Sequence, residues 1–335
     1  MMKVAVFSAK PYDRDSLNRE NERFGHELVY YETRLSPLTT RLAEGFPAVS
    51  VFVNDDVNAA TIANLAAQGT QLIATRSAGY NQIDLEAAAQ HNISVARVPS
   101  YSPNAISEFT VGLMLVLARQ IHRGYNRTRE NNFELNGLMG FELRDRTIGI
   151  VGTGRIGANV AKALSGFGST LLAYDYYEQP ELKGIVRYTT LEEIWQEACT
   201  ITFHVPLTPD THHMVNEHTL GQMRHGVMLI NTSRGALIDT AAVVEALKTG
   251  QVGALGIDVY EEEAHLFFQD LSNEVVRDDV FARLLTFPNV VVTAHQAFFT
   301  DEAMSNIAQT TLANISDFER NGTCANAITA DQMHA

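Results

Sequence analysis

The chain has 335 residues, which is enough for two domains of ordinary size. Hydrophobic residues make up 45% and charged residues 19%, as in a soluble globular protein. The net charge of −14 argues against binding to the phosphate backbone of a nucleic acid. We expect no membrane segment, no signal peptide and no metal site, because no apolar run is long enough and the two cysteines lack metal-ligand spacing. These features predict a cytoplasmic protein.

Short apolar segments alternate with helical segments through the first hundred residues. Strands are predicted at 3–8, 27–32, 48–53, 71–77 and 94–98, and helices at 13–24, 58–68 and 84–91. Asp84 is expected to cap the third of these helices. The alternation indicates a parallel sheet with helices on both faces.

A proline-containing segment at 99–103 interrupts this alternation. The helical spacing of Val111, Leu115 and Ala118 then predicts one long helix over 104–131. Its apolar stripe is expected to pack in the core and against another subunit. Further strands are predicted at 148–151, 170–175, 201–205, 227–232, 254–259 and 290–293, and helices at 158–164, 191–198, 240–249 and 279–285.

A last predicted helix, 301–320, is expected to return to the first unit, because the second sheet already has its strands. The fold class is therefore α/β, with two doubly wound parallel-sheet domains. Residues 1–100 and 299–335 would form a discontinuous, flavodoxin-like substrate domain. Residues 101–298 would form an inserted Rossmann domain, and we expect the chemistry in the cleft between the two.

A Gly-x-Gly-x-x-Gly turn stands between an apolar strand and a helix. In a dinucleotide site Gly152 allows the tight turn, Gly154 lets a pyrophosphate approach, and Gly157 lets the helix pack closely. The helix N-terminus attracts the anion. Asp175 ends the next strand, where a carboxylate accepts ribose hydroxyls and repels a 2′-phosphate. This pattern predicts NAD rather than NADP.

Polar residues also follow the later strands of this unit, where a doubly wound fold presents ligand groups. Hydride transfer to a ketone needs a proton donor, and His295 fits that task. A carboxylate beside an imidazolium keeps it charged, but spacing alone does not choose among Glu261, Glu262 and Glu263. Arg234 fits two-point binding of a 2-keto acid carboxylate. The adjacent His212 and His213 are expected to point apart rather than to share a metal.

Four motifs, at 151–157, 231–237, 258–261 and 293–298, resemble the D-isomer-specific 2-hydroxyacid dehydrogenases, over nearly the whole chain. Segments 52–56, 76–81, 121–123 and 258–268 look most like the fermentative bacterial D-lactate dehydrogenases. The resemblance implies reversible reduction of pyruvate to D-lactate by NADH, in a homo-oligomer. It makes Arg234 the substrate-binding arginine, Glu263 the carboxylate partner and His295 the acid/base.

The resemblance also implies the binding residues. For the cofactor these are Gly152, Gly154, Arg155, Ile156, Gly157, Asp175, His204, Val205, Pro206, Thr211, Thr232, Ser233, Arg234 and Asp258, of which Asp258 would contact the nicotinamide carboxamide. For the substrate they are Ala78, Gly79, Tyr101, Arg234, His295 and Phe298, with Phe52 as a further candidate.

Two alternatives stay open at this point. The enzyme could act on a bulkier 2-keto acid, or on glyoxylate or hydroxypyruvate. The chain could instead be an NAD-sensing corepressor, since relatives of this fold serve in that role and can keep the same three residues. Rapid turnover of pyruvate would distinguish the enzyme from the corepressor.

Overall fold

In the first unit, five parallel strands form a sheet in the order β2-β1-β3-β4-β5, the order of flavodoxin-like sheets. The computed structural model describes residues 1–263 and 266–328. The strands are β1 (Lys3–Val6), β2 (Glu27–Tyr30), β3 (Ala48–Val51), β4 (Leu72–Thr75) and β5 (Ser94–Ala96).

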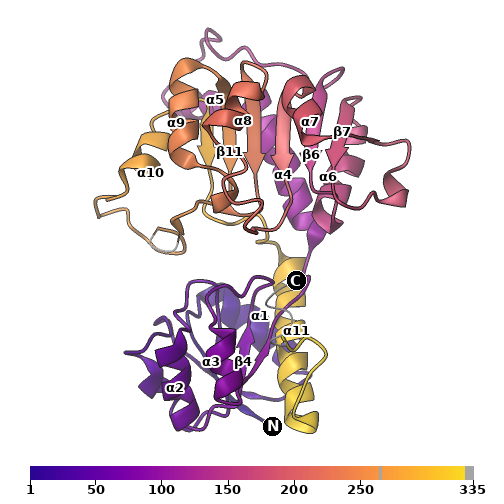
Figure 1. The fold of residues 1–335 in the computed structure, drawn as a ribbon. Coiled ribbons are helices and arrows are strands. Elements are labelled where there is room, and N and C mark those ends of the chain that lie inside the picture. The colour runs from indigo at the N-terminus through magenta and orange to yellow at the C-terminus, as the bar shows by residue number, and fades with distance from the viewer. Residues whose placement is uncertain (264–265, 329–335) are drawn as a thin grey trace. The chain divides into compact units, whose positions relative to one another are not determined.

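Helices cover both faces of this sheet (Figure 1). The helices are α1 (Pro11–Asn21), α2 (Ala59–Ala67), α3 (Leu85–Gln90) and α11 (Asp301–Asn321), with a short 3-10 turn η1 (Thr40–Ala43). Strand alternation separates two cores: Val4 and Val6 pack with α1 and α11, whereas Ala5 and Phe7 pack with α2 and α3. Asp84 caps α3 as predicted, since its side chain accepts the Ala87 N–H.

The second unit contains a seven-stranded parallel sheet in the order β12-β11-β10-β9-β6-β7-β8. The strands are β6 (Thr147–Val151), β7 (Thr170–Tyr174), β8 (Arg187–Tyr188), β9 (Thr200–Phe203), β10 (Val227–Asn231), β11 (Val252–Ile257) and β12 (Val290–Val292). The order reverses between β6 and β9, and doubly wound sheets bind ligands at the carboxyl ends of such strands.

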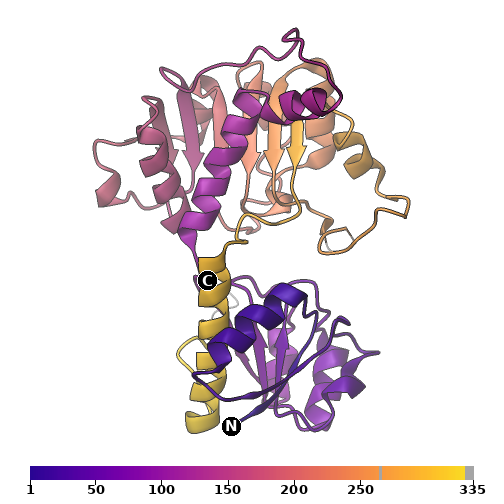
Figure 2. The same ribbon diagram turned by 180° about the vertical axis from the view of Figure 1, so that it is seen from behind.

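Two helical layers cover this sheet (Figure 1 and Figure 2). The helices are α4 (Pro103–Ala118), α5 (Ile121–Arg129), α6 (Arg155–Ser165), α7 (Leu191–Glu197), α8 (Glu217–Gln222), α9 (Thr240–Thr249) and α10 (Asp279–Leu284), with 3-10 turns η2 (Pro180–Leu182) and η3 (Gly235–Leu237). Helices α4 and α6 pack against Ile148 and Ile150 on one face, and α7 to α9 pack against Ile201 and Phe203 on the other. Both predicted doubly wound sheets are therefore confirmed.

The chain divides into two units, Met1–Ser102 with Phe299–Ala335, and Pro103–Phe298. The predicted substrate domain includes residues 329–335, and the segment 258–268 includes residues 264–265; both short stretches lie outside the described residues. Within the described ranges, no helix is both long and apolar enough to cross a membrane.

The single helix predicted over 104–131 is wrong. Helix α4 ends at Ala118 and α5 begins at Ile121, because Gln120 adopts a left-handed φ of 55° between them. The carbonyl of Ala118 accepts the Phe141 N–H at 2.9 Å, so a distant segment takes an acceptor that a continuous helix would use. The short elements β8 and α8 were not predicted from the sequence.

Candidate active site

The glycine turn joins β6 to α6. Gly152 has φ 93°, and a Cβ on Gly157 would lie 1.9 Å from the Gly152 carbonyl oxygen, so the turn admits no larger residue there. A Cβ on Gly154 would meet nothing within 4 Å, which leaves open space beside the helix N-terminus. No side chain caps α6, and its first N–H groups are therefore directed at a potential anion.

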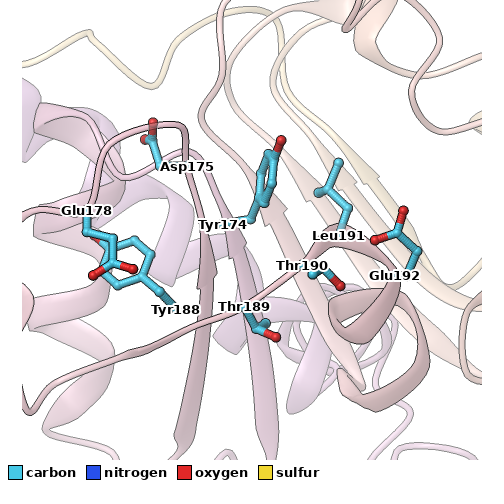
Figure 3. A pocket seen from close by; sticks show the side chains of 8 residues that line it. All are labelled: Tyr174, Asp175, Glu178, Tyr188, Thr189, Thr190, Leu191 and Glu192. Carbon is cyan, nitrogen blue, oxygen red and sulfur yellow. The ribbon is translucent and has the colours of Figure 1, made fainter.

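Asp175 follows β7 and is tied to this turn. Its Oδ2 accepts the Thr153 N–H at 2.6 Å and the Thr153 hydroxyl at 3.2 Å, while its Oδ1 accepts the Tyr177 N–H at 3.3 Å. The Thr153 link was not predicted from the sequence. A carboxylate has about four acceptor positions, so Asp175 can still accept ribose hydroxyls. Asp175 and Tyr174 both line a pocket of about 430 Å³ (Figure 3).

A larger cavity of about 570 Å³ adjoins the glycine turn. Seven of the predicted cofactor residues line it, namely Gly152, Gly154, Asp175, His204, Val205, Pro206 and Thr211. Apolar and aromatic side chains that the sequence did not single out complete the wall, among them Tyr174, Tyr176, Leu191, Trp195 and Met214. Polar side chains, among them Asp210, His213 and Asn216, also line it. A cavity of this size that combines apolar walls with polar groups is suited to a cofactor.

The remaining predicted cofactor residues lie elsewhere. Arg155 lines a hollow of about 390 Å³ at the start of α6. Ile156 packs against the core beneath α6, and the hydroxyls of Thr232 and Ser233 bond to Thr110 Oγ1 and to the Val205 carbonyl. The Thr211 hydroxyl donates to the Pro206 carbonyl at 2.7 Å within its own turn. Each hydroxyl keeps acceptor capacity, so the predicted cofactor contacts of Thr232 and Ser233 stay predictions.

His204 is neutral where it faces the glycine turn. Burial lowers the pKa of His204 to about 3, and its Nε2 lies 3.0 Å from the Thr202 hydroxyl. A Cβ added to Gly152 would be 2.7 Å from the His204 carbonyl carbon, so strands β6 and β9 meet closely here. His204 thus supports the turn as an uncharged group.

Arg234 follows β10 in a loop that the chain itself holds in place. The Asn231 side-chain amide donates to the Arg234 carbonyl at 2.8 Å, and the guanidinium donates to the Ser233 carbonyl at 2.8 Å. Arg234 is half-buried, and no carboxylate in the described part of the chain forms an ion pair with it. A partly desolvated guanidinium without a protein carboxylate is suited to an anionic ligand.

His295 follows β12 and pairs with Glu263. Its Nδ1 lies 2.9 Å from Glu263 Oε1, and Glu263 Oε2 accepts the Tyr260 N–H at 3.1 Å. Of the three glutamates left open by spacing, the structure thus places Glu263 beside His295. The Phe268 ring lies 5.9 Å from the imidazole. In histidine acid/base sites a carboxylate bonds to Nδ1 in this way and orients Nε2 toward the ligand.

Asp258 is buried and anchors the segment that carries His295. Its carboxylate accepts the Thr293 hydroxyl at 2.5 Å and the N–H groups of Gln296 and Ala297 at 2.9 and 2.8 Å. Burial raises the pKa of Asp258, and these hydrogen bonds oppose the shift. The predicted contact with a nicotinamide carboxamide stays a prediction, and the observed contacts add a positioning role.

The predicted substrate residues Ala78, Gly79 and Tyr101 belong to the first unit. Arg97 and the Ser77 hydroxyl donate to the carbonyls of Ala78 and Gly79 at 3.4 and 2.6 Å. In the described part of the chain, the N–H groups of Ala78 and Gly79 donate to no acceptor, so they are available to an anion.

Phe298 is buried at the end of the second unit, and the Tyr101 carbonyl accepts the Asn306 side chain at 2.7 Å. Their substrate contacts stay predictions.

The expectation that His212 and His213 point apart is wrong. Their rings stack with centroids 4.0 Å apart, because His213 has a left-handed φ of 49° in a turn rather than regular structure. Among the described residues, no group of three or more His, Cys, Asp or Glu is placed to hold a metal ion.

Comparisons with known proteins agree with this geometry. The family model for the NAD-binding domain of D-isomer-specific 2-hydroxyacid dehydrogenases matches residues 111–297. The chain is 52% identical to 2-hydroxyacid dehydrogenase homolog 1 of Schizosaccharomyces pombe, over 95% of this chain and 96% of that protein. It is 43% identical to an aromatic 2-oxoacid reductase of Clostridium sporogenes, over 97% and 98% of the two chains.

Among solved structures, the apo-structure of D-lactate dehydrogenase from Escherichia coli superposes with a TM-score of 0.90 at 45% identity, covering 98% of this chain and 100% of that one. The glycine turn, Arg234 and the histidine–glutamate pair lie in the region that the family model matches. The chain therefore belongs to the D-isomer-specific 2-hydroxyacid dehydrogenases, a family with an NAD-binding domain.

Proposed function

We propose that the protein is a D-lactate dehydrogenase that reversibly reduces pyruvate with NADH. The observation that carries the proposal is the His295–Glu263 pair, 2.9 Å apart. It lies in the same unit as Arg234, which forms no ion pair with a carboxylate of the described residues. These groups follow β10, β11 and β12, which are neighbours in the sheet. An acid/base and an anion-binding group on adjacent strand ends are what reduction of a 2-keto acid requires.

Each residue then has a defined task. The Arg234 guanidinium binds the pyruvate carboxylate through two N–H groups and polarises the neighbouring carbonyl. When bound at the glycine turn and Asp175, NADH would supply the hydride. His295 gives its Nε2 proton to the carbonyl oxygen, so that the hydroxyl of lactate forms and the imidazole becomes neutral. Glu263 holds the ring by Nδ1, and in lactate oxidation Nε2 accepts the hydroxyl proton.

NADH oxidation with pyruvate, followed by chiral analysis of the lactate, tests this proposal. Formation of D-lactate supports it, and L-lactate or no turnover contradicts it.

Arg234→Lys should raise the KM for pyruvate strongly and lower kcat while NADH affinity stays nearly unchanged, because lysine cannot form the planar two-point contact. An equal loss of NADH affinity would move Arg234 to the cofactor side.

A bulkier substrate is the second candidate, because a relative that matches nearly the whole chain is an aromatic 2-oxoacid reductase. Values of kcat/KM for pyruvate, 2-ketobutyrate, 2-ketoisocaproate and phenylpyruvate separate the two. A maximum at pyruvate supports a lactate enzyme, whereas a maximum at phenylpyruvate supports an aromatic one.

We also propose a homo-oligomer formed through α5 and the segment after it. Ile121, Tyr125, Phe133, Leu135 and Met139 are 52 to 91% exposed and close in sequence, and exposed apolar patches of this kind mark protein contacts. Sedimentation equilibrium should show at least a dimer, and the double variant Leu135→Glu, Met139→Glu should dissociate it.

The free thiols of Cys199 and Cys324 suit a reducing compartment, and we place the enzyme in the cytoplasm.

A further inference from the structure

Glu261 belongs to a second histidine–carboxylate pair, distinct from the pair at His295. We propose that His213 and Glu261 act as positioning residues that hold the segments carrying Arg234 and Glu263 and tie them to the wall of the dinucleotide cavity. This inference rests on the proposed function, because it assigns a task relative to Arg234 and Glu263. Neither residue would touch the reacting atoms.

The side chains of the pair join three parts of the second unit. His213 Nε2 lies 2.9 Å from Glu261 Oε2, and Glu261 Oε1 accepts the Thr240 N–H at 3.1 Å. Thr240 is the first residue of α9, where a carboxylate also interacts favourably with the helix dipole. The side chains of His213 and Glu261 are 34% and 23% exposed, so the pair is only partly screened by solvent.

The backbone of His213 is held as firmly as its ring. Its N–H donates to the Ala236 carbonyl at 2.8 Å, and its carbonyl accepts the Asn216 side-chain amide at 2.8 Å. Its left-handed φ of 49° is unusual for a residue with a side chain, and such conformations persist where the surroundings fix them. Here that conformation stacks His213 on His212 and aims Nε2 at Glu261.

The segment after Arg234 packs directly on the backbone of Glu261. A Cβ on Gly235 would lie 2.1 Å from the Tyr260 carbonyl carbon and 2.3 Å from the Glu261 nitrogen. Glu263 in turn accepts the Tyr260 N–H, so the same short turn carries both glutamates. The hydrogen bond from His213 that holds Glu261 therefore also holds the turn at Tyr260 and Glu261. The segment after Arg234 packs on this turn, and Glu263 belongs to it.

His213 also lines the 570 Å³ cavity together with Val205, Pro206 and Thr211. The loop that would contact the dinucleotide is thus bonded to the turn that holds the partner of His295. Removal of the bond should loosen that turn and misplace the catalytic groups, because supporting contacts of this kind set the geometry of groups that touch the ligand.

The test uses Glu261→Gln, His213→Asn and the double variant, with Glu262→Gln as the matched control. Glu262 is exposed, carries the same charge and stands next in the chain. At saturating NADH and pyruvate, Glu261→Gln and His213→Asn should each lower kcat on the order of tenfold. The double variant should lose no more than the larger single loss, because both changes break one bond. Glu262→Gln should keep the parent kcat.

A readout that needs no turnover separates this inference from the proposed function. In protein with ¹³C-labelled histidine, the His295 imidazole resonance is assigned by its absence in His295→Asn. Glu261→Gln and His213→Asn should shift that resonance, and Glu262→Gln should leave it in place. Failure of the parent to reduce any 2-keto acid contradicts the proposed function alone. An unmoved resonance, or multiplicative losses of kcat in the double variant, overturns the inference even in an active enzyme.

Discussion

The backbone N–H of His295 donates to the carbonyl of Asp258 at 2.7 Å, and the Asp258 carboxylate binds the next two N–H groups of the same turn. The proposed acid/base thus stands on a turn that one buried carboxylate holds, and its φ of 54° is imposed by that turn.

Asp258→Asn should destabilise this turn. An amide offers one acceptor oxygen and turns its NH₂ toward backbone N–H donors, leaving at least one of them unpaired. Loss of a buried hydrogen bond to a charged group costs about 1–3 kcal/mol in the free energy of unfolding. Urea unfolding measures the loss, and kcat should fall as well. Thr293→Val, which removes one of the three donors, should cost less; equal stability of Asp258→Asn and the parent would contradict the anchoring role.

Glu263→Gln should lower kcat. The amide keeps the size of the side chain, but only its oxygen accepts a hydrogen bond, so the contact with His295 Nδ1 or the contact with the Tyr260 N–H is lost. The value of kcat for pyruvate at saturating NADH measures the change. Glu262→Gln should match the parent, and an unchanged kcat in Glu263→Gln would remove Glu263 from its assigned role.

Two neighbouring glycines should respond differently to alanine. In Gly157→Ala the new methyl would overlap the Gly152 carbonyl at 1.9 Å, so the melting temperature should fall by several degrees. In Gly154→Ala the methyl enters open space and the backbone is already extended, so stability should be retained. That methyl should obstruct the pyrophosphate, and NADH titration should show at least tenfold weaker binding. The assignment is contradicted if Gly154→Ala binds NADH as the parent does.

Asp175→Asn should narrow the preference for NADH over NADPH. The amide oxygen can still accept the Thr153 N–H, so the glycine turn keeps its tie, while the charge that repels a 2′-phosphate is gone. The ratio of kcat/KM with NADH to kcat/KM with NADPH should fall by roughly tenfold, which corresponds to about 1.4 kcal/mol. An unchanged ratio counts against Asp175 as the discriminating residue.

His204 should make the protein sensitive to mild acid. Its pKa in the folded protein, about 3, lies below the ordinary 6.5. Between these two pH values the His204 side chain is protonated in the unfolded chain and neutral in the folded one. Stability is therefore lost as pH falls from about 6.5 toward 3, and is unaffected by this group above 6.5. His204→Asn removes that dependence. Melting temperatures from pH 7 to pH 4 should fall less steeply in the variant, and parallel curves would show that His204 does not stay neutral.

Local patterns in the sequence determined both sheets, nearly all of the longer elements and the glycine turn. These features can be read locally, because the alternation of strands and helices and the glycine turn between β6 and α6 are each set by residues close together in the sequence. Such patterns could not show the break at Gln120, because the cause is a hydrogen bond from Phe141 to Ala118.

Residue spacing left the pairings between strand ends open, and the family resemblance indicated only one of them, Glu263 with His295. The tertiary structure decided them. Three consecutive glutamates look alike in sequence, yet Glu261 meets His213, Glu263 meets His295 and Glu262 faces solvent. These partners come from loops after different strands, and the order β12-β11-β10-β9 brings those loops together. The physical reason is geometric. A hydrogen bond such as the 2.9 Å contact between His295 and Glu263 forms only where two backbone segments approach closely. Neither the residue types nor the spacing within one segment specifies that approach.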